Sequence, residues 1–350
     1  MNDTVIAIDI AKAVFELAIS HHTGRVDDRK RLNREQLVTY LVSIPPAVVV
    51  MEACGSAHYW ARKIQGLGQV VVLLPPHLVR PYVRRNKTDR ADAKGLLEAY
   101  RNKDIQPVPV KTPDQQCVGA LHRARSGWVK DRTAKLNQLR GLCREIGFFI
   151  PVGADKVVPA VRGLIGDAEQ ELARSFRVVM SEVCDEVAEI ERRLKLVDQE
   201  LTALSRQQPA IEAFLTIPGI GVVTATALFA FVGDLRRFPT ARHFASFVGL
   251  TPREHSSGLR RNLGRISKRG DVYLRHLLIH GARAVLGAAK RPNAAPPDRL
   301  RAWALELAGR AGNNKAAVAL ANKAARLAWM VATRNDIYRS VPPPTITPAA

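Results

Sequence analysis

The apolar residues near the start of the chain fall into short runs that are typical of β-strands. Residues 4–10 and 15–19 form two such runs, and a more polar one follows at residues 25–32. Two further runs, AVVVM at residues 47–51 and QVVVLL at residues 69–74, are rich in β-branched residues. They predict strands that are buried on both faces of a sheet.

Helical segments separate these strands. Residues 34–43 and 56–67 have helical patterns, and a third predicted helix contains Asp89 and Asp92. The order is therefore three strands, helix, strand, helix, strand, helix. It predicts an α/β domain with a mixed five-stranded sheet whose first three strands form a meander, which is the layout of ribonuclease H-like nucleases.

The middle of the chain has the most regular hydrophobic pattern. A helical pattern covers residues 113–147, a loop follows at residues 147–153, and apolar residues then alternate at spacings of three and four. This 3.5-residue repeat predicts a coiled coil through which the chain self-associates into a dimer or tetramer. An intramolecular hairpin with the preceding helix is the alternative. The apolar positions are Met180, Val183, Val187, Ile190, Leu194, Val197, Leu201 and Leu204.

The last third of the chain is predicted to be helical, with two glycine-containing interruptions. The first, IPGIG at residues 217–221, is typical of a helix-hairpin-helix turn, in which Gly219 and Gly221 let backbone N–H groups approach a phosphate. A tight turn between two helices with no ligand is the alternative. The second, residues 253–270, alternates cations with serine, glycine and asparagine, and predicts a mobile or ligand-ordered loop.

These patterns predict three domains and a tail. They are an α/β domain at residues 1–110, a helical coiled-coil region at 111–208, an all-α domain with the helix-hairpin-helix at 209–340, and a disordered tail at 341–350.

The charge is large and unevenly distributed. The 350 residues include 53 Lys and Arg against 32 Asp and Glu, a net charge of +21. The part after residue 234 carries a charge of +16, which predicts a phosphate-binding face rather than only a solvated basic surface. Its expected nucleic-acid contacts are Arg253, Arg260, Arg261, Arg265, Lys268 and Arg269. Near the aspartate pair, Arg84, Arg85 and Lys87 are expected to make the same contacts.

Other features narrow the function class. No stretch approaches the roughly 18 apolar residues of a membrane-spanning helix, and the start of the chain has no signal-peptide pattern. A cytoplasmic protein, associated with the nucleoid when active, is therefore expected. The four cysteines have no zinc-site or disulfide spacing, so they predict buried free thiols.

Four acids are candidates for a metal site. Asp9 interrupts an apolar strand, where an unpartnered carboxylate would cost several kcal/mol, and Glu52 directly follows a buried strand. Asp89 and Asp92, three residues apart, share one helical face. Two Mg²⁺ ions held by such carboxylates can drive in-line phosphoryl displacement. The alternatives are a salt bridge from Asp9 to Lys12 and salt bridges from the aspartate pair to its basic neighbours.

Five motifs, in this order, resemble those of the DEDD transposases of bacterial insertion-sequence family 110. The likeness extends over nearly the whole chain, and the combination is highly specific. The motifs are IDIAK at residues 8–12, MEACGS at 51–56, NKTDRADAKGL at 86–96, IPGIG at 217–221, and GLTPREHSSG with GRISKRG within 249–270.

The resemblance implies a complete catalytic apparatus. It implies a RuvC-like first domain whose Asp-Glu-Asp-Asp set is Asp9, Glu52, Asp89 and Asp92, holding two Mg²⁺ ions that Mn²⁺ can replace. It further implies a helical transposase domain with Ser257 as the nucleophile, donor and target DNA as substrates, and a structured bridge RNA that pairs with both DNAs. The acids of one protomer are expected to act with the serine of another.

The serine also has a physical rationale. Near Mg²⁺ and arginines, its alkoxide could attack a phosphate and conserve the bond energy for rejoining, which a recombinase needs and a nuclease does not. Ser256 adjoins Ser257, so the motif alone does not separate them. Two rival functions stay open: a RuvC-like junction-resolving endonuclease that uses water, and a non-catalytic nucleic-acid-binding protein.

Overall fold

The chain divides into two units. The computed structural model describes residues 4–21, 25–83, 88–258 and 260–342. The first unit is Met1–Pro113 and the second is Asp114–Ala350. The predicted regions 111–208 and 209–340 therefore lie in one unit, apart from the few residues before Asp114.

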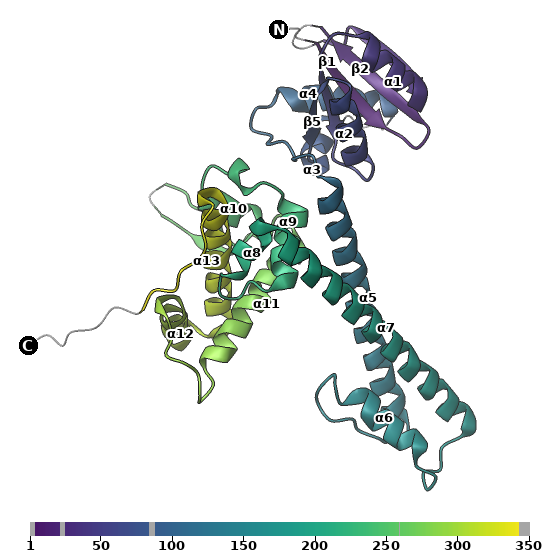
Figure 1. Cartoon of the computed structure of the whole chain (residues 1–350), viewed down its shortest axis with the longest axis vertical. Coiled ribbons are helices and arrows are strands. Elements are labelled where there is room, and N and C mark those ends of the chain that lie inside the picture. The colour runs from purple at the N-terminus through teal and green to yellow at the C-terminus, as the bar shows by residue number, and fades with distance from the viewer. Residues whose placement is uncertain (1–3, 22–24, 84–87, 259, 343–350) are drawn as a thin grey trace, which may run out of the picture. The chain divides into compact units, whose positions relative to one another are not determined.

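The first unit is built on a mixed five-stranded sheet, as predicted (Figure 1). The strand order is β3-β2-β1-β4-β5. The first three strands form an antiparallel meander, whereas β1, β4 and β5 run parallel to one another. The strands are β1 (Val5–Ile10), β2 (Val14–Ser20), β3 (Asp28–Asn33), β4 (Val48–Glu52) and β5 (Val70–Leu74).

The two faces of this sheet pack against different helices. Side chains alternate along each strand, so Ile8 and Met51 face one side and Ala7 and Val50 face the other. The Ile8 side packs against α1 (Arg34–Ser43) and α2 (Ala57–Gly66), and the Ala7 side packs against α4 (Asp89–Arg101). The α4 side is the one that receives the candidate acids.

Strand β5 ends at two prolines, which also begin the next element. Pro75 precedes and Pro76 starts the short helix α3 (Pro76–Val79), where the missing N–H of a proline in the first helical turn costs no hydrogen bond. A 3-10 turn, η1 (Arg80–Tyr82), follows.

The second unit begins with a long helical arm. The helices α5 (Pro113–Glu145) and α7 (Arg174–Gln207) lie side by side, with α6 (Val157–Gly166) at the far end (Figure 1). Met180, Val183 and Val187 are buried with residues of α5 and α6 of the same chain. Further along α7, Val197 and Leu201 are buried in a cluster that includes a residue of α5.

Self-association through this region stays a prediction. The structure has the intramolecular hairpin, and most seam residues are already covered within one chain. A 3.5-residue repeat shows that one helical face is buried, but it does not show which helix buries it. Two of the cysteines, Cys143 and Cys184, lie in this packing, whereas Cys117 is exposed and Cys54 is half-buried.

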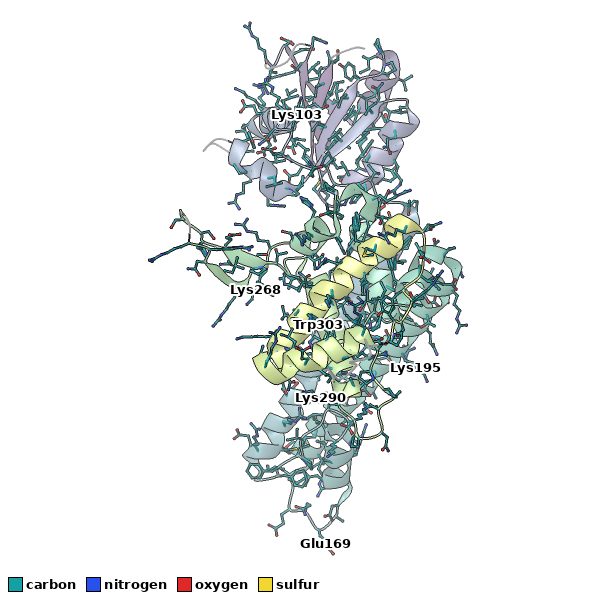
Figure 2. All side chains as sticks on the ribbon, turned by 90° about the vertical axis from the view of Figure 1, so that its left-hand side faces the viewer. Lys103, Glu169, Lys195, Lys268, Lys290 and Trp303 are labelled. Carbon is teal, nitrogen blue, oxygen red and sulfur yellow. The ribbon has the colours of Figure 1, made fainter. Side chains whose placement is uncertain are left out.

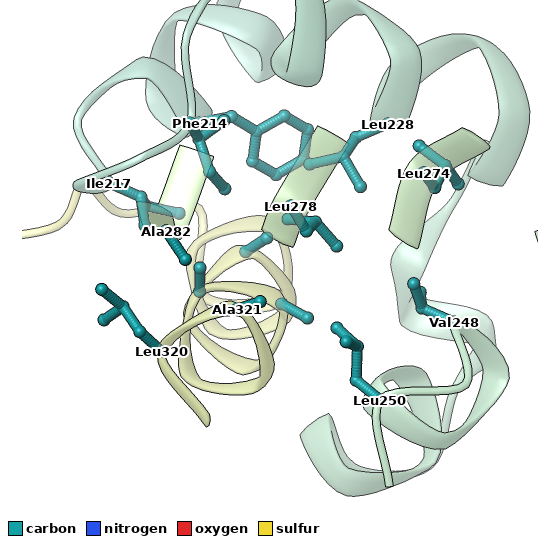
Figure 3. Packing of buried hydrophobic residues seen from close by; sticks show 14 of the residues in the cluster. Phe214, Ile217, Leu228, Val248, Leu250, Leu274, Leu278, Ala282, Leu320 and Ala321 are labelled. Carbon is teal, nitrogen blue, oxygen red and sulfur yellow. The ribbon is translucent and has the colours of Figure 1, made fainter. Parts of the chain in front are cut away.

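The rest of the second unit is a helical body around one core. Figure 3 shows this core, in which Phe214, Leu228 and Leu278 pack near Ala321 of the last helix. Buried alanines on that helix allow its close approach to its neighbours. The elements are α8 (Pro209–Leu215), α9 (Val222–Val232), η2 (Leu235–Arg237), α10 (Ala241–Phe247), β6 (Pro252–Glu254), β7 (Leu263–Ile266), α11 (Val272–Ala289), α12 (Arg299–Ala311) and α13 (Asn313–Arg334).

A buried histidine joins the arm to this body. Nε2 of His122 on α5 lies 3.0 Å from the hydroxyl of Thr226 on α9, and Nδ1 lies 3.0 Å from the hydroxyl of Tyr273 on α11. The Thr226 hydroxyl donates to the carbonyl of Val222 at 2.7 Å, so it accepts from Nε2, and Nδ1 accepts from Tyr273. Burial, assisted by the nearby Arg125, lowers the pKa of His122 to about 4. The imidazole is therefore neutral in the folded protein at pH 7.

The predicted tail lies mostly outside the described residues, which end at residue 342. Its first residue belongs to the fold, since the carbonyl of Val341 accepts a hydrogen bond from the N–H of Arg299 at 2.9 Å. Among the described residues, every helix is too short or too polar to span a bilayer.

Candidate active site

Two of the predicted acids lie at the ends of neighbouring parallel strands. Ile8 of β1 is in register with Met51 of β4, so the next residues, Asp9 and Glu52, lie towards the carboxyl ends of these strands. Asp9 lies two residues after Ala7, and Glu52 lies two residues after Val50. Both Ala7 and Val50 pack towards α4, so both acids belong to the face of the sheet that α4 covers. Both residues are partly exposed.

The other two acids lie in the first turn of α4. The Thr88 side chain caps this helix by accepting a hydrogen bond from the N–H of Ala91 at 3.2 Å. Asp92 is half-buried and lies four residues before Leu96, which packs on the sheet. Carboxylates are stabilised at a helix N-terminus by its dipole. The side chain of Asp89 is outside what the structure describes.

A fifth acid, Glu16, was not singled out from the sequence. It is directly opposite Asp9 in β2 and only 7% exposed. Its Oε1 lies 3.4 Å from Nε of Arg90, which stands between Asp89 and Asp92 in α4. The signal that could have identified Glu16 is the one used for Asp9, a carboxylate within an apolar strand.

The donor chemistry of this acidic face fits a divalent cation, because carboxylate oxygens are the ligands that Mg²⁺ prefers. The described side chains, however, include no three metal-ligand residues close enough together to hold an ion. Asp9, Glu52 and Asp92 thus lie on the same side of the sheet. They do not form a closed site among the described side chains, which leave out that of Asp89.

The predicted basic loop is a two-stranded ribbon, not an irregular segment. β6 and β7 pair antiparallel. Beyond them, the N–H of His255 donates to the carbonyl of Asn262 at 2.9 Å, and Ser257 and Arg260 exchange backbone hydrogen bonds of 3.3 and 3.2 Å. Backbone pairing of this kind does not require apolar side chains, so the composition did not reveal it. Figure 2 shows this ribbon, near Lys268, extending away from the helices of its own unit.

The cations of the ribbon are exposed, as a phosphate-binding surface requires. Arg253 donates to the carbonyl of Ser267 at 3.2 Å, and Arg261 lies 3.4 Å from Glu254. The exposed set is Arg253, Arg260, Arg261, Arg265, Lys268 and Arg269. The predicted contacts Arg84, Arg85 and Lys87 lie outside the described residues.

The two adjacent serines have different environments. The Ser256 hydroxyl donates to Oε1 of Glu254 at 2.7 Å and accepts from the N–H of Asn262 at 3.1 Å. Ser257 is exposed near the end of the ribbon, and no described residue forms a hydrogen bond with its hydroxyl. Of the two, Ser257 has the hydroxyl that is available to a substrate.

The base of the ribbon is fixed by a buried arginine that the sequence did not reveal. Arg275 of α11 is only 7% exposed, and its Nη1 donates to the carbonyls of Val248 at 3.0 Å and Arg269 at 2.9 Å. These carbonyls belong to the two ends of the segment that carries the ribbon. At the same crossing, Gly270 has a φ of +77°, and a Cβ there would lie 1.8 Å from the carbonyl oxygen of Phe247. Only glycine fits that position.

The two glycines of the predicted helix-hairpin-helix differ in their surroundings. Gly219 has a φ of +85° and packs against α11 so closely that a Cβ on Gly281 would lie 1.8 Å from the carbonyl oxygen of Gly219. Helix packing therefore accounts for Gly219 without a ligand. Gly221 is exposed at the N-cap of α9 and is the one of the two that is open to a phosphate.

Two family models match different parts of the chain. One, described as "Transposase IS116/IS110/IS902 family", matches residues 211–296. The other, the DEDD transposase model of IS110, described as "Transposase", matches residues 6–148. The second match contains the four acids of the first unit, and the first contains the whole basic ribbon.

Full-length relatives agree with these models. A probable family 20 transposase of Pseudomonas aeruginosa is 40% identical over 97% of this chain and 99% of its own length. The transposase for insertion sequence element IS1111A of Coxiella burnetii is 38% identical over 96% of this chain and 91% of its own length. The transposase for IS1328 of Yersinia enterocolitica is 35% identical over 96% of this chain and 99% of its own length. The chain therefore belongs to the IS116/IS110/IS902 family of insertion-sequence transposases, and it is a DNA-processing enzyme.

Proposed function

We propose that this transposase cuts, exchanges and rejoins DNA strands in a Mg²⁺-dependent reaction that passes through a phosphoserine at Ser257. The single observation that carries the proposal is the difference between the two serines. The Ser256 hydroxyl is used within the ribbon, whereas the Ser257 hydroxyl is exposed among arginines and has no partner among the described residues.

The four acids are assigned the task of holding the metal. DEDD transposases are typically metal-dependent. Asp9 and Glu52 would supply ligands from the sheet, and Asp89 and Asp92 from α4. Two Mg²⁺ ions, or Mn²⁺ in their place, would polarise the scissile phosphate and stabilise charge on the oxygens that attack and leave.

The serine step conserves the phosphodiester energy. The Ser257 Oγ attacks the scissile phosphorus and loses its proton, a new O–P bond forms, and the bond from phosphorus to the DNA oxygen breaks. That oxygen leaves as a free DNA hydroxyl after taking up a proton. In the reverse step, a hydroxyl from the other DNA attacks the phosphoserine, which restores the serine and joins the exchanged strands. The exposed arginines of the ribbon would bind the phosphates beside the reacting one.

The proposed assembly contains donor DNA, target DNA, a structured bridge RNA and more than one protomer. The acids of one protomer would act with the Ser257 of another in a dimer or tetramer. Most of the α7 seam is covered within the chain, which favours an assembly through other surfaces. The charge of +16 on the part after residue 234 suits a load of RNA and two DNA duplexes.

A denaturing gel with end-labelled donor DNA tests the chemistry. We expect a protein–DNA adduct that survives denaturation, forms with Mg²⁺ and is absent with EDTA. A RuvC-like endonuclease that uses water would give cut DNA without an adduct. A non-catalytic nucleic-acid-binding protein would give neither product nor any response to Mg²⁺.

Sequencing the RNA that co-purifies with the protein tests the guide. We expect one discrete structured RNA encoded beside the gene. A random sample of cellular RNA would contradict the bridge-RNA part of the proposal and leave the metal and serine chemistry to be judged by the gel.

A further inference from the structure

A basic groove lies beside the acidic face of the first unit, between residues 25–29 and α4. It has a volume of about 260 Å³ and four cations on its walls, against one carboxylate. We infer that this groove is a nucleic-acid-binding site that holds the phosphodiester backbone of a single DNA strand. The inference rests on the proposed function, because it assumes that the strand brought to the four acids is DNA. The groove is lined by Arg25, Val26, Arg29, Lys94, Leu97, Glu98 and Arg101.

Helical periodicity places one wall of the groove. Lys94 and Arg101 are seven residues apart, so they lie on one side of α4, about 10 Å apart along its axis at roughly 1.5 Å per residue. A distance of that order lets two cations contact different phosphates of one strand. The single carboxylate, Glu98, is paired with Lys94 at 3.7 Å, and both side chains are substantially exposed, so the pair can open at little cost.

Strand register places the other wall. In β3, Arg29 is opposite Ala18, and Arg31 is opposite Glu16, so both arginines belong to the face of the sheet that α4 covers. Because β3 is the edge strand, this face is open beyond it. Arg29 and Arg31 thus place two positive charges along the edge of the sheet, on the same face as Glu16.

A direct contact joins the groove to the candidate active site. Nη1 of Arg29 donates to the carbonyl of Arg90 at 3.2 Å. Arg90 lies in the first turn of α4, between the two aspartates, and pairs with Glu16. A strand in the groove would therefore pass beside the turn that carries Asp89 and Asp92, which is where a scissile phosphate has to be delivered.

The chemistry of the lining selects a nucleic-acid strand. Arginine and lysine bind phosphate oxygens, and the partly buried Val26 is the apolar side chain of the lining that is open to a sugar or base, since Leu97 is only 6% exposed. RNA presents the same phosphates, and the assignment to DNA follows from the position of the groove beside the acids. The test therefore carries separate DNA and RNA arms.

Site-specific photocrosslinking of the full chain tests the location. Benzoylphenylalanine is placed at position 26, in the groove, or at position 42, where Val42 is 63% exposed on α1 on the opposite face of the sheet. Labelled single-stranded DNA and RNA of the same sequence are offered in EDTA, so that no cleavage occurs. We expect DNA to be captured at position 26 and not at position 42. Equal capture at both positions, no capture at position 26, or preferential capture of RNA would overturn the inference.

The salt dependence of DNA binding gives a second, independent measurement. Each phosphate contact to a single strand contributes about 0.7 to the slope of log K against log salt. The double variant Lys94→Gln/Arg101→Gln should therefore lower the slope by about 1.4. As a result, the wild type should lose about sevenfold more affinity than the variant between roughly 50 and 200 mM salt.

The matched control is Arg34→Gln/Lys63→Gln on α1 and α2, which cover the opposite face. An equal change of the salt slope in both variants would overturn the inference that the groove binds DNA. Because both measurements are made without metal, they are independent of cleavage. A protein that binds in the groove but forms no adduct would contradict the serine chemistry alone.

Discussion

The acidic face and the basic ribbon hold their candidate groups by different means. Asp9 and Glu52 lie on strands whose central residues are buried on both faces of the sheet, so packing fixes their positions. Ser257 extends from a ribbon whose side chains are almost all exposed. Backbone hydrogen bonds and one buried arginine at its base hold that ribbon. The acids are therefore held in fixed positions by the packed sheet. The ribbon, in contrast, can move relative to the helical body while Ser257 and its arginines keep their places within it.

The largest expected effect is at the acidic face of the first unit. Asp9→Ala should lower DNA cleavage at least about a thousandfold, because a bound metal supplies several kcal/mol of transition-state stabilisation. DNA binding, measured by gel shift in EDTA, should be unchanged. Asp104→Ala, at an exposed aspartate of the same unit, is the matched control and should cleave as the wild type does. Cleavage by Asp9→Ala at the wild-type rate would remove the acids from the mechanism.

The second effect concerns the base of the ribbon. Arg275→Ala deprives two carbonyls, those of Val248 and Arg269, of a charged donor, and should cost about 4 kcal/mol of unfolding free energy. Hydrogen exchange in residues 250–270 should accelerate more than in the sheet of the first unit. Arg265→Ala, on the exposed ribbon, should leave the unfolding free energy unchanged. Equal stability of the two variants would mean that Arg275 does not anchor the ribbon.

A third prediction uses pH to test the buried histidine of the helical body. The pKa of His122 is about 4 in the folded protein, below the ordinary value of 6.5 in the unfolded chain. The unfolded state therefore binds more protons, so this stability is present above pH 6.5 and is lost as the pH falls towards 4, by about 3 kcal/mol.

Chemical denaturation of the second unit between about pH 7 and pH 4.5 measures this loss. His122→Gln should flatten the pH dependence, even though it lowers stability at neutral pH. An unchanged slope in His122→Gln would show that another group titrates.

The smallest expected effect is at Glu16. Its pairing with Arg90 ties β2 to the first turn of α4, which makes it a positioning residue for the aspartates there. Because Arg90 is largely exposed, Glu16→Gln should change the unfolding free energy by less than about 1 kcal/mol. The Mg²⁺ concentration for half-maximal cleavage should rise about tenfold, in line with other residues that orient metal ligands. An unchanged Mg²⁺ requirement would restrict Glu16 to a structural role.

The sequence predicted the strand order well, because the order of strands and helices admits few topologies. It did not predict that β5 is an edge strand, in which Val70 is 57% exposed although its run was expected to be buried on both faces. It predicted Asp9 as a site residue from the carboxylate within an apolar strand, and the same signal, present at Glu16 in VFELAIS, was not used there. The α7 seam was predicted as a buried face, but its partner could not be, since a repeat contains no information about the covering helix. Arg275 could not be predicted, because a buried arginine within a helix has the same sequence pattern as an exposed one.

The central claim is that Ser257, and not Ser256, becomes linked to DNA in a metal-dependent step. The most direct test is peptide mass mapping of the protein–DNA adduct formed with Mg²⁺, after protease and nuclease digestion. We expect the nucleotide remnant on Ser257 in the wild type, and no adduct in Ser257→Ala, whereas Ser256→Ala should still form one. A remnant on Ser256, or an adduct that persists in Ser257→Ala, would contradict this claim.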